Sequence, residues 1–550
     1  MTNKELANLI FPNITKTIAD YENLYPKRNL DEKAVVTRFA PSPTGFVHLG
    51  SLFSSFVARK VATQTNGICF LRIEDTDQER LVENSVTEII RDLKNYQIEF
   101  DEGMISEEEE KGNYGPYIQS KRKDIYQAFA KYLIEEGLAY PCFLTESELA
   151  EIREVQEASK ERIGCYGKYA KYRDLPNEMV AEKINNGEPY IIRLKSPGNF
   201  DKKVVVNDLI RGKIEFPEND LDIVIIKKDG LPTYHFAHLV DDYLMGTTHV
   251  IRGDEWVSSL PVHVQLFEVF GFKTPKYAHL SPLMKIDEET GGKRKLSKRK
   301  DPELAVSFYH EAGIPEEAVL LYLMTIANSN FEAWFDANPS SSINEFTFDF
   351  KKVSASGALF DLEKLNNISK NYISKLKATE VYNRTLIYAK EFDPEFASIL
   401  EKYPDYSTSI FNIEREQKKP RKDYATFKEV KNEVWYMYDE YFIGDINYEF
   451  GKVNEESEIH TILSTYFTKY YNAEDDKETW FNKIKELSKE LGYCPDMKEY
   501  KAAPDAYKGN VADISTVIRV ALTSKSQTPD LYEILKLLGI EKIQNRISKF

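Results

Sequence analysis

The chain has 550 residues, 42% of them hydrophobic and 13% aromatic, and its formal net charge is −16. This length is too great for one hydrophobic core, so we expect two to five domains, and the acidic balance argues against a protein that simply coats nucleic acid. No apolar run reaches eighteen residues, which excludes a membrane-spanning helix, and four cysteines are too few for a disulfide framework, which indicates a reducing cytoplasm.

The elements predicted for the first hundred residues alternate between strand and helix. Residues 1–34 form a leader that is too polar for a secretion signal and to which we assign no function. After it we predict a short strand at Val35, a helix that ends at Gly67, a strand at 68–73 and a helix at about 86–96. This alternation is typical of one half of a doubly wound parallel sheet.

The following segment interrupts that pattern. Thr145 and Glu148 form a capping-box signature, which predicts the start of a helix. We predict helices at 121–136 and 146–162 and strands at 190–194, 204–206 and 221–226. These elements indicate an inserted α+β domain, after which the sheet resumes at 234–240 and 249–256 and most of the remaining chain is helical.

The first motif that indicates chemistry lies between the first strand and the first helix, at residues 38–50. A turn built from proline, serine, threonine and glycine lets the backbone approach a ligand, and the helix start offers unpaired N–H groups to phosphate. His48 follows about one turn into the helical segment. Taken alone, the motif fits equally well an ordinary loop with Thr44 as the helix cap.

The second motif is the basic segment at residues 293–300, in which six of eight residues are lysine or arginine, preceded by Gly291 and Gly292. In isolation such a glycine-hinged loop is typical of a solvated surface or a localisation tag. Together, the two motifs resemble the two signatures of class I aminoacyl-tRNA synthetases. His48–Ser51 matches His-x-Gly-x, with Ser51 in the place of a histidine, and Lys295–Arg299 matches Lys-x-Ser-Lys-x.

Four further matches narrow the resemblance to bacterial-type glutamyl-tRNA synthetases. The matching segments are 38–50, 71–77, 233–242, 249–256, 295–299 and, near the end, 518–523. The resemblance implies a Rossmann-like α/β catalytic core with an inserted α+β domain, followed by all-α anticodon-binding domains. It also implies that L-glutamate reacts with ATP to give glutamyl-AMP and pyrophosphate, and that glutamate then passes to the 3′-terminal adenosine of tRNA-Glu. Members of this family characteristically need tRNA bound before activation proceeds.

The same resemblance divides the chain into seven parts. These are an N-terminal extension (1–34), the first half of the catalytic core (35–115), an inserted acceptor-end-binding domain (116–220), the second half of the core (221–275), a stem-contact region with the basic loop (276–350) and two helical anticodon-binding domains (351–430 and 431–550). A monomer is expected from the resemblance alone.

A glutamate site needs at least one guanidinium for a carboxylate and one acidic group for the ammonium. Arg38 and Arg252 could form bidentate, charge-assisted pairs with the side-chain carboxylate. Each of these arginines taken alone fits a surface salt bridge, and Glu74 taken alone fits a carboxylate at a strand end. With the resemblance, the glutamate-binding residues are predicted to be Arg38, Ala40, Ser42, Glu74, Tyr234, His238 and Arg252. His238 is a departure, since related bacterial enzymes often have asparagine there.

Activation is the attack of a carboxylate on the α-phosphorus of ATP, which needs positioning and charge stabilisation rather than a protein nucleophile. His48 is predicted to donate to phosphate oxygens, and Lys298, with Lys295 nearby, to neutralise charge on the leaving pyrophosphate, which carries Mg²⁺. The predicted catalytic residues are His48, Gly50, Lys295, Ser297 and Lys298. The predicted ATP-binding residues are Pro43, Thr44, Gly45, His48, Gly50 and Lys298.

No metal site is predicted. Some relatives bind structural zinc in the inserted domain through a Cys-x-Cys pair followed by tyrosine and cysteine. Here Cys142 is followed by Phe143 and Leu144, so the second thiolate is missing, although Cys165 and Tyr166 lie at a comparable distance. Structural zinc needs four ligands, and we expect none to bind.

Three alternative functions are each disfavoured by residues or segments that this chain has. A glutaminyl-tRNA synthetase would bind a neutral amide and would not need Arg252, and it would carry β-barrels in place of the helical C-terminal part. A truncated relative that glutamylates a tRNA base would lack that part. A non-catalytic RNA-binding paralogue would lose His48, Lys298 or Glu74. Whether tRNA-Gln is also a substrate, and which residues read the anticodon, stays open.

Overall fold

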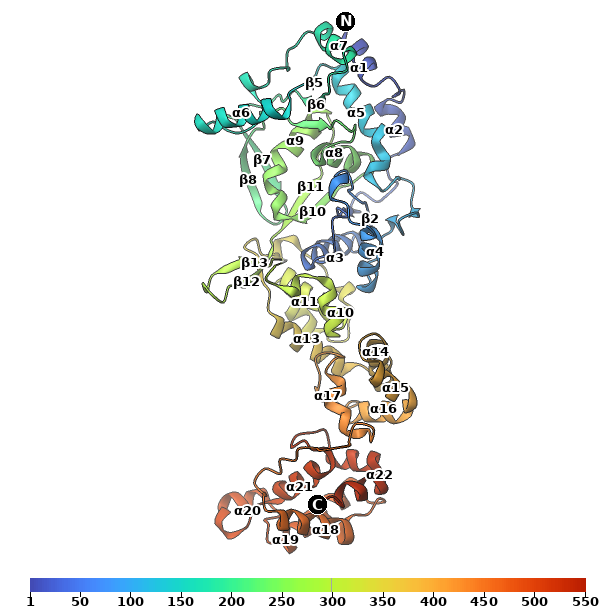
Figure 1. Cartoon of the computed structure of the whole chain (residues 1–550), viewed down its shortest axis with the longest axis vertical. Helices are drawn as coiled ribbons and strands as arrows, with labels where there is room; N and C mark the ends of the chain where they lie inside the picture. Colours follow the sequence, from blue (N-terminus) through green and yellow to red (C-terminus); the bar gives the residue numbers. More distant parts are fainter. Residues whose placement is uncertain (298) are drawn as a thin grey trace. The chain divides into compact units, whose positions relative to one another are not determined.

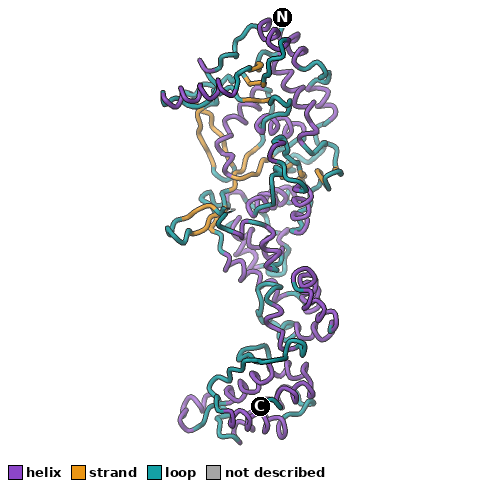
Figure 2. The backbone as a smooth tube through the Cα atoms, in the orientation of Figure 1, coloured by secondary structure: helices purple, strands orange, loops and turns teal. Residues whose placement is uncertain are grey.

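The computed structural model describes residues 1–550 except residue 298 and divides into two compact units. The first unit comprises residues 1–308 and 320–361, and the second comprises residues 309–319 and 362–550. All strands of the described residues belong to the first unit, and the second is helical (Figure 2). Among the described residues, no helix has the length and apolar character needed to cross a membrane.

The first unit begins its sheet with β1 (Val36–Phe39), β2 (Ile68–Leu71) and β3 (Glu102–Met104), which pair in parallel. A short strand, β4 (Glu110–Lys111), runs antiparallel to β3. The connecting helices are α3 (Leu49–Thr63) and α4 (Ser85–Asn95), so the predicted alternation of strand and helix is confirmed. β1 is buried along its whole length, as expected for a strand covered on both faces.

The second half of the core continues this arrangement. β10 (His249–Gly253) and β11 (Lys276–Leu280) are parallel, and α8 (Tyr234–Leu244) and α9 (Leu260–Val269) lie beside them (Figure 1). Three hydrogen bonds join Thr248, just before β10, to the backbone of Val36 in β1. β1 runs parallel to β2, and β10 runs parallel to β11. In folds of this type ligands bind at the carboxyl ends of the parallel strands.

The segment predicted as an insertion contributes to two sheets. β5 (Ala139–Cys142) and β6 (Ile191–Leu194) form an antiparallel sheet with β9 (Val224–Ile226), which lies beyond residue 220, in the segment predicted as the second half of the core. β7 (Lys203–Asp208) and β8 (Gly212–Pro217) extend the core sheet beside β11. Its helices are α5 (Lys123–Glu135), α6 (Glu146–Ala158) and α7 (Asn177–Asn185). The predicted capping box at Thr145 is confirmed at the start of α6.

The leader is a packed part of the first unit. Its helices are α1 (Asn3–Ile10), which is amphipathic, and α2 (Ile18–Leu24), and α1 lies against α5 and α7. Arg28 follows them and forms a bidentate ion pair with Glu102 of β3, with both N···O distances 2.8 Å, while its guanidinium lies 3.8 Å from the ring centre of Tyr114. The leader therefore joins the insertion to the edge of the catalytic sheet.

The basic segment differs in part from the predicted loop. Residues Lys293–Lys295 form strand β13, which pairs antiparallel with β12 (Leu283–Ile286), and a third short strand, β14 (Ala358–Leu359), completes the sheet. The reason is a tight turn between β12 and β13, in which Gly291 takes a φ of 67° and donates its backbone N–H to Asp287. The first three basic residues are thus held in a hairpin.

Helices account for the remainder of the chain. α10 (Val306–Ala312), α11 (Glu316–Ala327) and α12 (Phe331–Ala337) follow the hairpin. The second unit contains α13 (Leu362–Lys375), α14 (Ala378–Phe392), α15 (Pro394–Lys402), α16 (Pro404–Asn412), α17 (Val430–Val434), α18 (Glu456–Thr465), α19 (Lys477–Glu490), α20 (Met497–Ala502), α21 (Val511–Thr523) and α22 (Leu531–Ile547). The matching segment 518–523 is a buried part of α21, so its residue pattern reflects core packing.

Candidate active site

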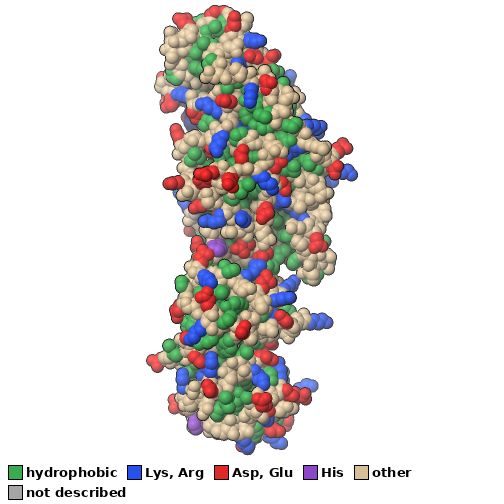
Figure 3. Space-filling model, turned by 90° about the vertical axis from the view of Figure 1, so that its right-hand side faces the viewer, with side chains coloured by type: hydrophobic (Ala, Val, Ile, Leu, Met, Phe, Trp, Pro, Cys, Tyr) green, Lys and Arg blue, Asp and Glu red, His purple; other side chains and the backbone are tan. Residues whose placement is uncertain are grey.

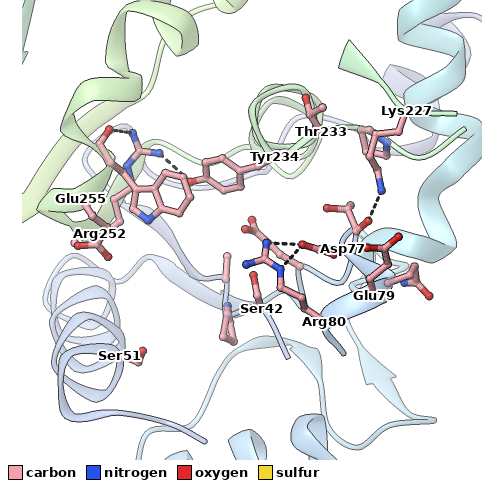
Figure 4. A pocket seen from close by; sticks show the side chains of 18 of the residues that line it. Ser42, Ser51, Asp77, Glu79, Arg80, Lys227, Thr233, Tyr234, Arg252 and Glu255 are labelled. Atoms are coloured by element: carbon pink, nitrogen blue, oxygen red, sulfur yellow. Dashed lines mark hydrogen bonds and ion pairs between the residues drawn. The ribbon is translucent and has the colours of Figure 1, made fainter. Parts of the chain in front are cut away.

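A cavity of about 1260 Å³ opens at the carboxyl ends of β1, β2 and β10. Figure 4 shows Ser42, Tyr234 and Arg252 facing this space. The sequence-predicted residues that line it are Arg38, Ala40, Ser42, His48, Gly50, Glu74, Tyr234, Arg252 and Lys295. The fold thus brings together side chains from three strands and from the two motifs, which lie about 250 residues apart in the chain.

Five other predicted residues do not line the cavity. Pro43 is buried and accepts hydrogen bonds from Ser85 and Val82, which anchors the turn to α4. Thr44 and Gly45 continue that turn, and Gly45 takes a φ of 141°, a conformation that favours glycine. His238 is fully buried and Ser297 is half-buried. Lys298 lies outside the described residues.

A buried ionic cluster forms the floor of the site. Arg72 donates to Asp242 at 2.8 Å and to Glu74 at 3.0 Å, and Arg38 lies 3.4 Å from the other oxygen of Asp242. Burial raises the pKa of Asp242, but Arg72 and Arg38 outweigh it and hold that pKa well below its usual range. His238 adds to the cluster, with Nδ1 2.6 Å from Asp242. Asp242 and the cluster around it therefore fix the position of Arg38.

Glu74 differs from Asp242 in the balance of these effects. Burial raises the pKa of Glu74, and the nearby Arg72 and Arg38 only partly oppose the rise. The carboxyl group lines the cavity while one of its oxygens accepts from Arg72. A bound ammonium group would stabilise its charged form and lower its pKa, so the position suits an amino group of a ligand.

Arg252 projects from β10 beside aromatic side chains. Its Nη1 donates to the hydroxyl of Tyr234 at 3.0 Å (Figure 4). The Tyr234 ring lies against Trp256, with ring centres 4.2 Å apart. Burial raises the pKa of Tyr234, whereas Arg252 lowers it. Tyr234 is therefore a neutral hydroxyl that can donate to an anion placed beside Arg252.

The spacing of the first motif has a geometric reason. His48 is the N-cap of α3, and its Nδ1 accepts from the backbone N–H of Ser51 at 3.1 Å, so the helix cap is His48 and not Thr44. A Cβ on Gly50 would stand 3.2 Å from His48 Nδ1, closer than an ordinary contact. Gly50 thus leaves room for the imidazole at the start of a helix, where backbone N–H groups can bind phosphate.

Gly50→Ala is expected to lower the rate of ATP-dependent activation about tenfold, because a displaced His48 would no longer be aligned with phosphate. The substitution should not unfold α3, since alanine is favoured over glycine in helices by roughly 0.5–1 kcal/mol. The measurement is the rate of ATP–pyrophosphate exchange, with Thr63→Ala, an exposed position at the end of the same helix, as the control. An unchanged exchange rate in the Gly50 variant would show that His48 tolerates the methyl group.

The basic segment is fastened by Asp301, which the sequence reasoning missed. Arg294 makes a bidentate pair with Asp301 at 2.6 and 2.8 Å, and the backbone N–H of Ser297 donates to the same carboxylate. These hydrogen bonds hold the pKa of Asp301 well below its usual range. Lys295 lines the cavity, with Nζ 3.9 Å from a carboxylate oxygen of Glu255. The only sequence signal for Asp301 was its position as an acidic residue soon after the basic segment.

The region in which some relatives bind zinc holds a different polar group. Cys142 and Cys165 are buried, and the hydroxyl of Tyr140 donates to Asp222 at 2.9 Å. Burial raises the pKa of the Cys165 thiol, which opposes the thiolate form that binds metals. Among the described residues, no group of three or more histidine, cysteine, aspartate or glutamate side chains is arranged to hold a metal ion.

Sequence comparisons agree with these features. Residues 34–367 match the family "tRNA synthetases class I (E and Q), catalytic domain", and residues 421–550 match "Anticodon binding domain". The chain is 50% identical to a glutamate–tRNA ligase of Clostridium perfringens (strain SM101 / Type A), with all of both chains covered. It is 40% identical to a glutamate–tRNA ligase of Sorangium cellulosum (strain So ce56), with 96% of this chain and 97% of that protein covered.

A solved structure is similar over nearly the whole chain. It is the crystal structure of a glutamate tRNA ligase from Elizabethkingia meningosepticum, in complex with its amino acid. The TM-score is 0.73 and the sequence identity 28%, and the match covers 94% of this chain and 99% of the other.

Proposed function

The chain belongs to the glutamate–tRNA ligases of class I, with ATP as a substrate, and from this premise we propose how its own residues perform the reaction. The activity is the attachment of glutamate to tRNA. The observation that carries the assignment of roles is the cavity itself, which is lined by two buried arginines, a buried carboxylate and the histidine at the start of α3. Glutamate has one ammonium and two carboxylates, and these groups match that set of charges.

Arg252, Tyr234 and Arg38 bind the side-chain carboxylate of glutamate in this proposal. Glu74 accepts from the ammonium group, together with the Ser42 hydroxyl and the backbone carbonyl of Ala40. This orientation is supported by the charged groups near the Tyr234 hydroxyl. Arg252 and Arg38 lower the pKa of Tyr234, and Glu74 raises it. His238, which does not line the cavity, acts on the substrate only through Asp242 and the arginines that Asp242 holds.

The α-carboxylate attacks the α-phosphorus of ATP, so that a new carboxylate–phosphorus bond forms as the bond to pyrophosphate breaks. His48 and the N–H groups at the start of α3 donate to phosphate oxygens, and Lys295 and Lys298 neutralise charge on the leaving pyrophosphate. Mg²⁺ is proposed to accompany the nucleotide and to supply further charge neutralisation. The 2′-hydroxyl of the terminal adenosine then attacks the glutamyl carbonyl, and AMP leaves.

The partner is proposed to be tRNA-Glu, with residues 116–220 at its acceptor end, 276–350 at its stem and the helical domains at its anticodon. Acidic and basic side chains are interspersed over the face shown in Figure 3, as expected if RNA is bound through local patches. We also propose that bound tRNA is required for activation, and that the enzyme works as a monomer in the cytoplasm.

The test is ATP–pyrophosphate exchange with glutamate or glutamine, each with and without tRNA-Glu. We expect exchange with glutamate only when tRNA is present. Exchange with glutamine would change the assignment to a glutaminyl-tRNA synthetase. Exchange with glutamate in the absence of tRNA would contradict the proposed requirement for tRNA. Charging of purified tRNA-Gln, measured separately, decides whether it is a second substrate.

A further inference from the structure

Four of the eight histidines in the chain surround Arg252 and its neighbour Tyr277. They come from α8, α9 and β11 and are His235, His238, His263 and His279. Two of them, His263 and His279, contact the guanidinium of Arg252 directly and are fully buried. None of the four lines the cavity, so their role is not to touch the substrate.

The hydrogen bonds of these two histidines determine their protonation. Nε of Arg252 donates to Nε2 of His279 at 3.0 Å, and Nδ1 of His279 lies 2.7 Å from Asp208. Nη2 of Arg252 lies 3.1 Å from Nδ1 of His263, whose Nε2 lies 2.9 Å from Nδ1 of His235. A guanidinium has only donors, so both imidazoles accept from it and both are neutral. The second nitrogen of each ring then carries the proton.

Burial acts in the same direction. It lowers the pKa of His263 well below its usual range, with further lowering by His238 and Arg252. It also lowers the pKa of His279, although Asp208 opposes the change. At neutral pH both rings therefore remain uncharged acceptors.

The surroundings of the other buried arginines are different. Arg38 and Arg72 lie 3.4 and 2.8 Å from carboxylate oxygens of Asp242, which offset their charges. Among the described residues, no carboxylate is recorded within 4.0 Å of Arg252; it is held instead by imidazoles, the Tyr234 hydroxyl and the carbonyl of Trp256. Neutral acceptors fix a guanidinium without cancelling its charge.

We propose that His263 and His279 are positioning residues that orient Arg252 and leave its full charge for the side-chain carboxylate of the substrate. On this view the histidines contribute to the preference for glutamate over glutamine, because the amide of glutamine has no charge with which to pair. The inference rests on the proposed role of Arg252 in the glutamate pocket.

The decisive test compares two isosteric variants of the full chain, His263→Asn and His263→Asp. Both retain an oxygen near the position of Nδ1, but only the aspartate introduces a negative charge. The KM and kcat for glutamate and for glutamine are measured by pyrophosphate exchange in the presence of tRNA. We expect the asparagine variant to stay within about threefold of the parent KM for glutamate. The aspartate variant should raise that KM about tenfold, leave kcat largely unchanged and narrow the preference for glutamate.

Equal glutamate KM values in the two variants would overturn the proposal. His279→Gln and His279→Leu form a second pair for the case in which a His263 variant does not fold, as judged by thermal unfolding. The glutamine keeps an acceptor near Nε2 and should preserve the KM, whereas the leucine should raise it; similar values would contradict the proposal.

The matched control is His249→Asn, which alters another histidine of the strand that carries Arg252 and should leave both KM values unchanged. Arg252→Ala distinguishes the assignment of the glutamate pocket from the proposed role of the histidines. If that variant uses glutamate normally, the assignment of the pocket fails; if it is impaired while the His263 pair behaves alike, only the role of the histidines fails.

Discussion

Replacement of Arg252 by alanine is expected to raise the KM for glutamate about a hundredfold and to abolish most of the discrimination against glutamine. Arg252 is almost fully buried at the cavity wall, and its partners within the protein are neutral. Truncating one partner of a buried charge pair typically costs 2–5 kcal/mol, and about 2.8 kcal/mol corresponds to a hundredfold change. Use of glutamine should change far less, because its side chain offers no charge to the guanidinium.

The measurement is kcat/KM for both amino acids in pyrophosphate exchange with tRNA present. Arg91→Ala is a suitable control, since Arg91 lies on α4 with its side chain 63% exposed and pairs with the adjacent Asp92. If the ratio of the two kcat/KM values is the same in the Arg252 variant and the parent, Arg252 does not read the side chain of the substrate.

Lys298→Ala is expected to lower kcat for exchange by roughly 10²–10³-fold while leaving the binding of glutamate nearly unchanged. This lysine is identified by its place in the second motif and lies outside the described residues. Its proposed charge acts on the leaving pyrophosphate, where negative charge increases in the transition state, so its loss affects the barrier rather than the ground state. Loss of one such donor costs about 2.7–4 kcal/mol.

Single-turnover formation of glutamyl-AMP and equilibrium binding of glutamate, measured on the same samples, separate the two effects. Lys300→Ala removes an exposed lysine from the same basic segment and should leave both quantities unchanged. Equal losses in adenylate formation and in glutamate binding would contradict a role confined to the transition state.

Local sequence signals were sufficient for much of the fold. Hydrophobic periodicity predicted the strand–helix alternation of the core, and the capping box at Thr145 predicted the start of α6. In the basic segment the prediction of a loop was wrong for residues 293–295, because the pairing of β13 with β12 depends on a turn that the charge pattern does not reveal. The turn residue Gly291 was visible, but the register of the hairpin was not.

The sequence by itself determined the family, and it predicted nine of the residues that line the cavity, because the motifs depend on residue types at short, specific spacings. Only the tertiary structure showed which distant residues hold the side chains of the site in position. Arg72 meets Asp242 across 170 positions of the chain, and His279 meets Asp208 across 71. Pairing between such distant side chains depends on how strands and helices pack, for which a single sequence carries no local signal. The neutral surroundings of Arg252 therefore became evident only when α9 and β11 were placed beside β10.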